Sequence, residues 1–338
     1  MRREVTSPMR KGSLEENLTT RIFCAEAASM GTRSKSGRII GRDLLGRYDI
    51  SIPMRRRALL TIPMLPAAAA PGMLLSVRVE PLFPGLTLEQ QLERVAAAGY
   101  QGYEFGDWRA QDARRIVALQ RKLKLECVCL VGNKGVNPVG MGLCDPAERA
   151  GFLAEIAASA EAAERFETKK MVVLSGFRVP GMTREAMHAS MVEGLKRAHD
   201  IVARRGVTMI VEVINTLAKI EPLNPKGDNH ARYFLDRTPE AFQMVREVGS
   251  PYFQILYDLY HVQIMEGNLI ETIRANVAAI GHIHVADVPG RHEPGTGEIH
   301  FGNVFRAIRE SGYKGYVGME YIPSKDAMET LREVKRLV

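Results

Sequence analysis

From Met73 to its C-terminus the chain alternates short apolar runs with longer amphipathic stretches, and eight such repeats can be laid out. This alternation is typical of βα units that build a parallel sheet. The 266 residues involved match the roughly 250 residues of a (β/α)₈ barrel. An open doubly wound sheet would need a glycine-rich phosphate turn after its first strand, and EPLFPG at residues 80–85 is not one. The sequence therefore predicts an α/β protein with a TIM barrel over residues 73–338.

The repeats give explicit boundaries for strands and helices. The expected strands are Leu74–Glu80, Gly102–Phe105, Glu126–Val131, Lys170–Ser175, Thr208–Ile214, Gln254–Tyr257, Gly281–Ala286 and Gly315–Glu320. The clearest helical patterns are Leu88–Ala98, Ala110–Leu123, Ala147–Phe166 and Arg184–Arg205. Gly99 and Gly206 follow two of these helices, where a glycine readily adopts the left-handed conformation that ends a helix.

Residues 1–72 differ in composition from the rest of the chain. They hold 13 Lys and Arg against 6 Asp and Glu, whereas the residues from Met73 onward hold 33 of each kind. Residues 1–53 lack strand or helix periodicity, which predicts a poorly structured extension. Residues 54–70 run from Met-Arg-Arg-Arg through an apolar segment to four alanines, the layout of a secretory signal peptide. The protein is expected in the cytoplasm, or exported if translation starts at Met54; a disordered tail with an Ala/Pro linker is the alternative.

Charge and cysteine content narrow the classes of partner. The even charge balance of the barrel region argues against nucleic acid, because a phosphate-binding surface needs an excess of Lys and Arg. No apolar run is long enough to cross a membrane as a helix. Cys127 and Cys129 lie two residues apart on an expected strand and are predicted to be reduced core residues. A small-molecule substrate is the expected partner, and the formation of a homo-oligomer stays open.

Acid and imidazole groups stand at the ends of four consecutive expected strands. They are Glu212, Asp258, His284 and Glu320. In a TIM barrel the catalytic residues lie where strands end and βα loops begin. A carboxylate within an apolar strand is costly to bury unless it is paired or binds a metal. Three carboxylates and one imidazole suit Mn²⁺ or Mg²⁺, with Co²⁺ as a further option, better than structural zinc. The sequence thus predicts one divalent metal ion at these four side chains.

These strand ends, the loop RHEPGTGE at residues 291–298 and the closing EYIP at residues 320–323 resemble the hydroxypyruvate isomerase family. That family belongs to the xylose isomerase-like TIM barrels, and the resemblance covers the chain from about Met73 onward. It implies an aldose–ketose isomerase that converts hydroxypyruvate to tartronate semialdehyde, with the predicted metal ligands in the family's ligand positions. Hydroxypyruvate isomerases have Gln at position 284, whereas the His284 of this chain is similar to the ketose 3-epimerases.

The resemblance also implies roles for individual residues. Glu212 and Glu320 correspond to the two glutamates that move a proton between adjacent carbons through an enediolate. Arg291 is expected to hold a substrate carboxylate, because a guanidinium can donate two parallel hydrogen bonds to it. His261 lies three residues after Asp258 and is expected to bind a substrate oxygen.

Three further side chains lie near the expected barrel mouth. Glu104 and Trp108, at and after the end of the second strand, are expected to wall the substrate pocket, with Trp108 packing on substrate carbons. His282 should face the same side of its strand as His284, because side chains two residues apart point the same way. His282 is expected to contact a metal ligand from behind or to pack in the core, rather than to bind the metal itself.

Three other functions stay open at this point. A ketose 3-epimerase that acts on a free sugar is the rival among enzymes because of His284. A non-catalytic sugar-binding barrel is the second, since a fold alone does not fix the chemistry. An endonuclease IV-like nuclease is suggested by D-x-x-H at residues 258–261. That enzyme needs further histidines at the ends of strands two and three, where this chain has Glu104 and Asn133.

Overall fold

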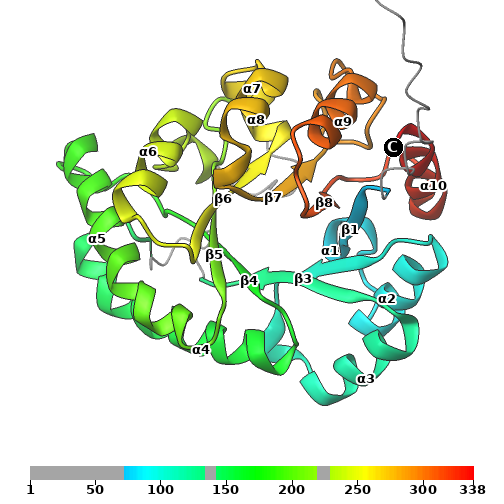
Figure 1. Ribbon diagram of the computed structural model, residues 1–338, viewed down its shortest axis with the longest axis horizontal. Coiled ribbons are helices and arrows are strands. Elements are labelled where there is room, and N and C mark those ends of the chain that lie inside the picture. Colours follow the sequence, from blue (N-terminus) through cyan, green and yellow to red (C-terminus); the bar gives the residue numbers. More distant parts are fainter. Residues whose placement is uncertain (1–71, 134–141, 219–228) are drawn as a thin grey trace, which may run out of the picture. The chain divides into compact units, whose positions relative to one another are not determined.

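Eight parallel strands form one closed barrel in chain order (Figure 1). The computed structural model describes residues 72–133, 142–218 and 229–338. The strands are β1 Leu74–Arg78, β2 Gly102–Phe105, β3 Glu126–Val131, β4 Lys170–Val173, β5 Thr208–Glu212, β6 Phe253–Asp258, β7 Ile280–Val285 and β8 Tyr316–Met319. The barrel closes because β1 pairs with β8, with Leu74 opposite Tyr316 and Val77 opposite Met319. The predicted (β/α)₈ TIM barrel is confirmed.

Helices surround the strands (Figure 1). Those in the described residues are α1 Val79–Leu82, α2 Leu88–Ala97, α3 Ala113–Leu123, α4 Arg149–Arg165, α5 Arg184–Ala203, α6 Thr238–Val248, α7 Leu259–Met265, α8 Leu269–Asn276, α9 Phe301–Glu310 and α10 Ala327–Leu337. Side-chain caps set several starts, since Thr87, Asp112 and Thr183 accept hydrogen bonds from the first backbone N–H groups of α2, α3 and α5.

The predicted boundaries differ from the observed ones by three residues or fewer. The first strand was expected to reach Glu80, but it ends at Arg78 because the next four residues form the short helix α1. The helix expected from Ala110 begins at Ala113, where the Asp112 cap holds its first turn. Gly99 and Gly206 have φ angles of 74° and 61°, so both end their helices in the left-handed conformation, as expected.

Two kinds of side chains fill the interior of the barrel, because alternate residues of each strand point inward. The side formed by β3 to β6 is apolar, and we call it the apolar wall. Its side chains are Cys129, Val172, Ile210 and Leu256. The side formed by β1, β2 and β7 is polar, and we call it the polar wall. Its side chains are Ser76, Glu104, His282 and His284, which are buried and hydrogen-bond with one another.

Some sequence predictions lie outside the described residues. Residues 1–71 include the expected extension and the signal-like segment 54–70, so both stay predictions. Within the described ranges, no helix has the length and apolar character needed to span a bilayer. Cys127, Cys129 and Cys144 are buried free thiols, which confirms the predicted reduced core cysteines.

Candidate metal centre at the barrel mouth

The four predicted ligand residues come together at the carboxyl ends of the strands. Glu212 and Asp258 are the last residues of β5 and β6, His284 is the last but one of β7, and Glu320 directly follows β8. One ligand atom from each lies within 4.8 Å of all the others. Opposite ligands of a six-coordinate Mg²⁺ at about 2.1 Å lie about 4.2 Å apart, so the cluster has the dimensions of a site for one ion.

The carboxylates of this cluster experience opposite electrostatic effects. Burial, with Glu320 as the next cause, raises the pKa of Glu212 to about 8. Burial also raises the pKa of Asp258 to about 6, although Arg291 opposes the shift. Burial would raise the pKa of Glu320 as well, but His284 and Arg291 outweigh it and hold that pKa well below its usual range. The cluster therefore combines one carboxyl, Glu212, that retains its proton at neutral pH with another, Glu320, that is ionised.

His284 points one ring nitrogen at the cluster and the other at the barrel interior. Its Nε2 lies 2.7 Å from Glu104 Oε2. Its Nδ1 is buried, lies 3.2 Å from Glu320 Oε2, and makes no hydrogen bond to any residue that the structure describes. Burial lowers the pKa of His284, but Glu104 and Glu320 outweigh it and raise that pKa above its usual value. A buried nitrogen that faces three carboxylates without a hydrogen bond fits a metal ligand.

His261 faces the same cluster from the first turn of α7. Its Nε2 lies 3.7 Å from Glu212 Oε1 and 3.5 Å from Asp258 Oδ2. Its Nδ1 lies 2.6 Å from Asn215 Nδ2, which is a donor, so Nδ1 accepts and the proton of the neutral ring is on Nε2. The Asn215 amide thus directs an N–H group of His261 at the mouth, where a substrate oxygen is expected.

Arg291 reaches the cluster from the loop after β7. One of its terminal nitrogens lies 3.3 Å from Asp258 Oδ2 and 2.6 Å from Glu320 Oε2. The guanidinium stands 5.0 Å from the ring centroid of Tyr260, and the residue is only 3% exposed. Its φ of 56° is left-handed, a conformation that costs energy in a non-glycine residue and that the loop must enforce.

Asp287 organises the loop that carries Arg291. Its Oδ1 accepts from the backbone N–H groups of Val288 and Ile299, and its Oδ2 accepts from those of Gly295 and Gly297, at 2.8 to 3.1 Å. Close packing requires glycine at position 297, because an added Cβ would overlap the Val288 carbonyl. The buried carboxylate of Asp287 therefore holds the backbone of most of the thirteen-residue loop 287–299.

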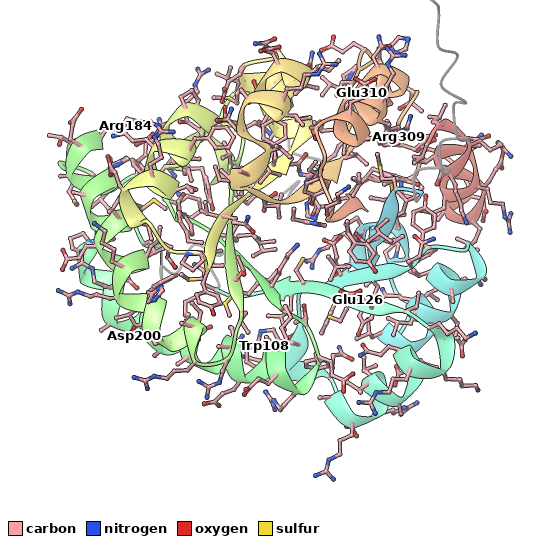
Figure 2. All side chains as sticks on the ribbon, viewed as in Figure 1. Trp108, Glu126, Arg184, Asp200, Arg309 and Glu310 are labelled. Carbon is pink, nitrogen blue, oxygen red and sulfur yellow. The ribbon has the colours of Figure 1, made fainter. Side chains whose placement is uncertain are left out.

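Glu104 and Trp108 are both buried, and neither is among the four predicted metal ligands. Glu104 is fully buried in the polar wall, where its two oxygens contact His282 and His284. Trp108 is buried near β3, and its Nε1 donates to the Val131 carbonyl over 3.1 Å (Figure 2). The guanidinium of Arg109 covers the indole ring at 4.0 Å. The expected contacts of Glu104 and Trp108 with a substrate stay predictions.

Sequence reasoning overlooked three residues that shape this site. Asn215 orients the ring of His261, and Asp287 holds the backbone of the loop that carries Arg291. Arg78 ends β1, and its Nε lies 3.8 Å from Glu320 Oε1 and 3.3 Å from Glu80 Oε2. The signal for Arg78 in the sequence is its positive charge at a strand end, beside strand ends that carry acids and imidazoles.

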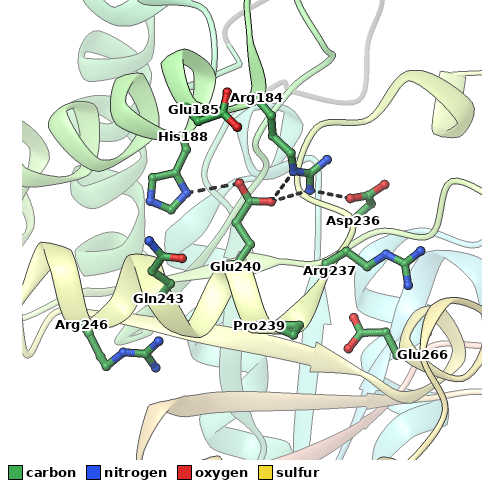
Figure 3. Close-up of a pocket in the computed structure, with 10 residues that line it drawn as sticks. All are labelled: Arg184, Glu185, His188, Asp236, Arg237, Pro239, Glu240, Gln243, Arg246 and Glu266. Carbon is green, nitrogen blue, oxygen red and sulfur yellow. Dashed lines mark hydrogen bonds and ion pairs between the residues drawn. The ribbon is translucent and has the colours of Figure 1, made fainter.

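A second group of charged side chains lines a pocket between α5 and α6 (Figure 3). Arg184 donates to Asp236 Oδ1 over 2.7 Å and also to Glu240. His188 Nδ1 lies 3.2 Å from Glu240 Oε1. These charges pair with one another, and the four predicted ligand residues do not line this pocket. This pocket is therefore distinct from the cluster of ligand-type residues at the barrel mouth.

The family model described as xylose isomerase-like TIM barrel matches residues 92–337. This range contains all four ligand-type residues and the loop with Arg291. The chain belongs to the xylose isomerase-like TIM barrel family. Membership confirms the superfamily named from the strand ends, and it accounts for the position of the cluster at the carboxyl ends of β5 to β8.

Two of the similar proteins are named as isomerases of small acids. The hydroxypyruvate isomerase of Escherichia coli (strain K12) is 29% identical over 260 residues, which cover 76% of this chain and 96% of that protein. A 2-oxo-tetronate isomerase of Cupriavidus necator is 32% identical over 178 residues, covering 53% of this chain and 64% of that protein. The predicted resemblance to hydroxypyruvate isomerases is confirmed, and the chain is an isomerase.

One solved structure matches this chain over most of its length. It is the crystal structure of an AP endonuclease, family 2, from Brucella melitensis, with a TM-score of 0.70 and 27% identity. The match covers 78% of this chain and 99% of that chain. It supports the fold of the region that carries the cluster.

Proposed function

We propose that this xylose isomerase-like protein is a metal-dependent aldose–ketose isomerase of small hydroxy-oxo acids, with hydroxypyruvate and tartronate semialdehyde as its substrate pair. The observation that carries the proposal is the position of Arg291, a nearly buried cation against Asp258 and Glu320. Once these two carboxylates act as metal ligands, the guanidinium can turn to a substrate carboxylate with a forked contact. A neutral sugar offers no such partner. The names of the two bacterial relatives agree with this class of substrate.

The proposed cofactor is one Mn²⁺ or Mg²⁺ ion, with Co²⁺ as an alternative. Glu212, Asp258 and Glu320 would supply carboxylate oxygens and His284 its Nδ1, a set dominated by hard oxygen donors. When bound, the cation polarises the carbonyl and hydroxyl oxygens of the substrate. The protein's own side chains would bind the substrate and move its protons.

Glu212 and Glu320 are the proposed proton-transfer pair. One proton leaves C3 of hydroxypyruvate and one arrives at C2, while the hydroxyl proton passes from the C3 oxygen to the C2 oxygen. An enediolate forms between the two steps, so a base, an acid and an oxyanion partner are required. The Nε2–H of His261 faces Glu212 and Asp258 and can donate to the substrate oxygen that gains negative charge.

The experiment that tests this function is a substrate screen. Purified protein is incubated with hydroxypyruvate, tetronates and common ketoses in D₂O, with Mn²⁺, Mg²⁺ or Co²⁺, and solvent deuterium in the carbon skeleton is followed by NMR. We expect exchange and product with hydroxypyruvate or a related acid, and none after chelation of the metal. Mn²⁺ binding without exchange into any compound would instead favour a non-catalytic binding barrel.

A ketose 3-epimerase is the second candidate, and His284 is the observation that favours it. Its Nδ1 is directed at the cluster, and His at this position resembles the ketose 3-epimerases. Deuterium at C3 of a free ketose, with no exchange into any acid, would replace the isomerase proposal with this one.

A further inference from the structure

The carboxylate of Glu104 is surrounded by hydrogen-bond donors inside the barrel. Its Oε1 accepts from Ser76 Oγ at 2.6 Å and lies 2.9 Å from His282 Nε2. Its Oε2 lies 2.7 Å from His284 Nε2 and 3.4 Å from Cys129 Sγ. Glu104, Ser76 and His282 are 0% exposed, so water cannot replace any of these donors. A carboxylate held in this way has one stable position.

The pairing fixes which nitrogen of His284 can bind a metal. Because Glu104 Oε2 accepts a hydrogen bond, the Nε2 of His284 carries a proton. The ring then presents its Nδ1 to the other ligand-type residues, 3.2 Å from Glu320 Oε2. Carboxylates that accept from the remote nitrogen of a ligating histidine orient the ring and increase its basicity.

A glycine in β8 makes room for this arrangement. A Cβ added to Gly318 would overlap Glu104 Oε1 and would lie 3.0 Å from His282 Nε2 and 2.9 Å from His284 Cδ2. A methyl group at position 318 would therefore press directly on the point where the two imidazoles meet the carboxylate. The backbone of β8 and the donors of the polar wall hold Glu104 in place from different directions.

From this geometry we infer that Glu104 is a positioning residue of the proposed metal site. Its carboxylate, which also contacts His282, holds the His284 ring so that Nδ1 faces the cation. The inference rests on the proposed metal site and assigns no contact between Glu104 and the metal or the substrate. It gives a function to a buried carboxylate that the proposed reaction does not use.

Mn²⁺ affinity, measured by electron paramagnetic resonance at constant pH, tests the inference without any turnover. Glu104→Gln and Gly318→Ala should each weaken Mn²⁺ binding by about 10- to 100-fold, as is typical when the partner of a ligating histidine is lost. Ser76→Ala is the matched control, because it removes a donor to the same carboxylate and leaves the His284 contact in place. It should change the affinity less than about threefold, well below that range. Circular dichroism confirms that each variant is folded.

A double-mutant cycle separates positioning from a general structural role. In a His284→Ala background, Glu104→Gln should have almost no further effect on Mn²⁺ affinity, because the side chain through which Glu104 acts is missing. An equal loss in both backgrounds would overturn the inference. So would parent-like Mn²⁺ affinity in the Glu104→Gln single variant.

The ring nitrogens of His284 supply a direct readout. Protein with ¹⁵N-labelled histidine is loaded with Zn²⁺ as a diamagnetic probe, and its ¹H–¹⁵N spectrum is assigned through the signals lost in His284→Gln. We expect a metal-bound Nδ1 and a protonated Nε2; a metal-bound Nε2 overturns the inference. If the parent protein binds neither Mn²⁺ nor Zn²⁺, the proposed metal site fails, and the inference fails with it. Metal binding through Nε2 would overturn the inference about Glu104 and leave the proposed metal site intact.

Discussion

The apolar wall and the polar wall lie below the four ligand-type residues of the candidate metal centre and give them different surroundings. Glu212 and Asp258 end β5 and β6 above the apolar wall, and burial raises the pKa values of their carboxyls to about 8 and about 6. Glu320 follows β8 beside the polar wall. There His284 and Arg291 hold the pKa of its carboxyl low despite the effect of burial.

This difference shows how one buried site can contain three carboxyls without three negative charges. His284 and Arg291 lie beside Glu320 and keep it ionised, while the raised pKa of Glu212 lets that carboxyl retain a proton at neutral pH in the absence of a metal. The apolar wall supplies packing and a low dielectric, and the polar wall supplies hydrogen bonds that orient a ligand. Each wall can be changed separately, so the contrast can be tested.

The largest expected effect concerns the glutamates on the two sides of the centre. Glu212→Gln and Glu320→Gln should each reduce kcat by on the order of 10³-fold or more, because each removes a proton-transfer group and a metal ligand. Steady-state kinetics on the substrate identified by the screen measures the loss. Glu126→Gln, at the start of β3 and far from the mouth, is the matched control and should retain activity. Substantial turnover in either variant would contradict the two-glutamate mechanism.

Arg291 contacts Asp258 on one side of the centre and Glu320 on the other. Arg291→Ala should reduce kcat/KM for hydroxypyruvate by about 10²-fold, since it removes a charge-assisted, two-bond contact with the substrate carboxylate. Arg291→Lys should recover part of the loss, because lysine retains the charge without the fork. A neutral ketose should be much less affected. An unchanged rate with hydroxypyruvate would exclude a carboxylic acid substrate.

The pKa contrast predicts how metal binding depends on pH. Because the pKa of Glu212 is raised to about 8, the metal-free protein keeps a proton there that the metal must displace. Mn²⁺ affinity should therefore rise from pH 6 to pH 8, by up to about tenfold per pH unit for each proton released. Calorimetry in buffers of different ionisation enthalpy counts the protons. A constant affinity over this range would contradict the prediction.

The same raised pKa has the opposite effect on the metal-free fold. A carboxyl whose folded pKa lies above its unfolded value stabilises the protein at low pH, and that contribution is lost as pH rises toward the folded value. The melting temperature of metal-free protein should thus fall between about pH 5 and pH 8 relative to that of the loaded protein. Thermal unfolding with and without Mn²⁺ across this range gives the comparison.

The smallest effect is expected in the apolar wall. Ile210→Val removes one buried methylene and should lower the free energy of unfolding by about 1 kcal/mol. Mn²⁺ affinity should stay at the parent value, because Ile210 belongs to the apolar cluster and not to the ligand-type group. Denaturant unfolding and an Mn²⁺ titration measure the two quantities. A loss of Mn²⁺ affinity in Ile210→Val would mean that the apolar wall also affects metal binding, which would contradict the proposed difference between the walls.

Much of the site could be predicted because it follows the strand pattern. Glu212, Asp258, His284 and Glu320 each interrupt an apolar strand near its end, and parallel strands in a barrel bring such ends together. Burial inside the barrel then concentrates their charges. The length and period of the repeats were likewise enough to predict the barrel, because both can be read from the local sequence.

What could not be predicted depends on contacts across the closed barrel. Glu104 meets His282 and His284, which are 178 and 180 residues away in the chain, and no local pattern encodes that pairing. The approach of Arg78 to Glu320 likewise depends on the pairing of the first strand with the last. The left-handed backbone conformation of Arg291 is imposed by the hydrogen bonds of its loop. Those hydrogen bonds form because the Asp287 side chain points into the loop.

The Asp287 loop has a consequence for protein engineering. Since the Asp287 side chain ties Val288, Gly295, Gly297 and Ile299 together, the backbone of the segment is held from within, and its exposed side chains take no part in those hydrogen bonds. Exposed positions such as Thr296 and Glu298 can be varied, provided that Asp287, Gly297 and Arg291, the proposed partner of a substrate carboxylate, stay unchanged. A library built in this way would test which loop positions influence substrate choice while the barrel beneath stays unchanged.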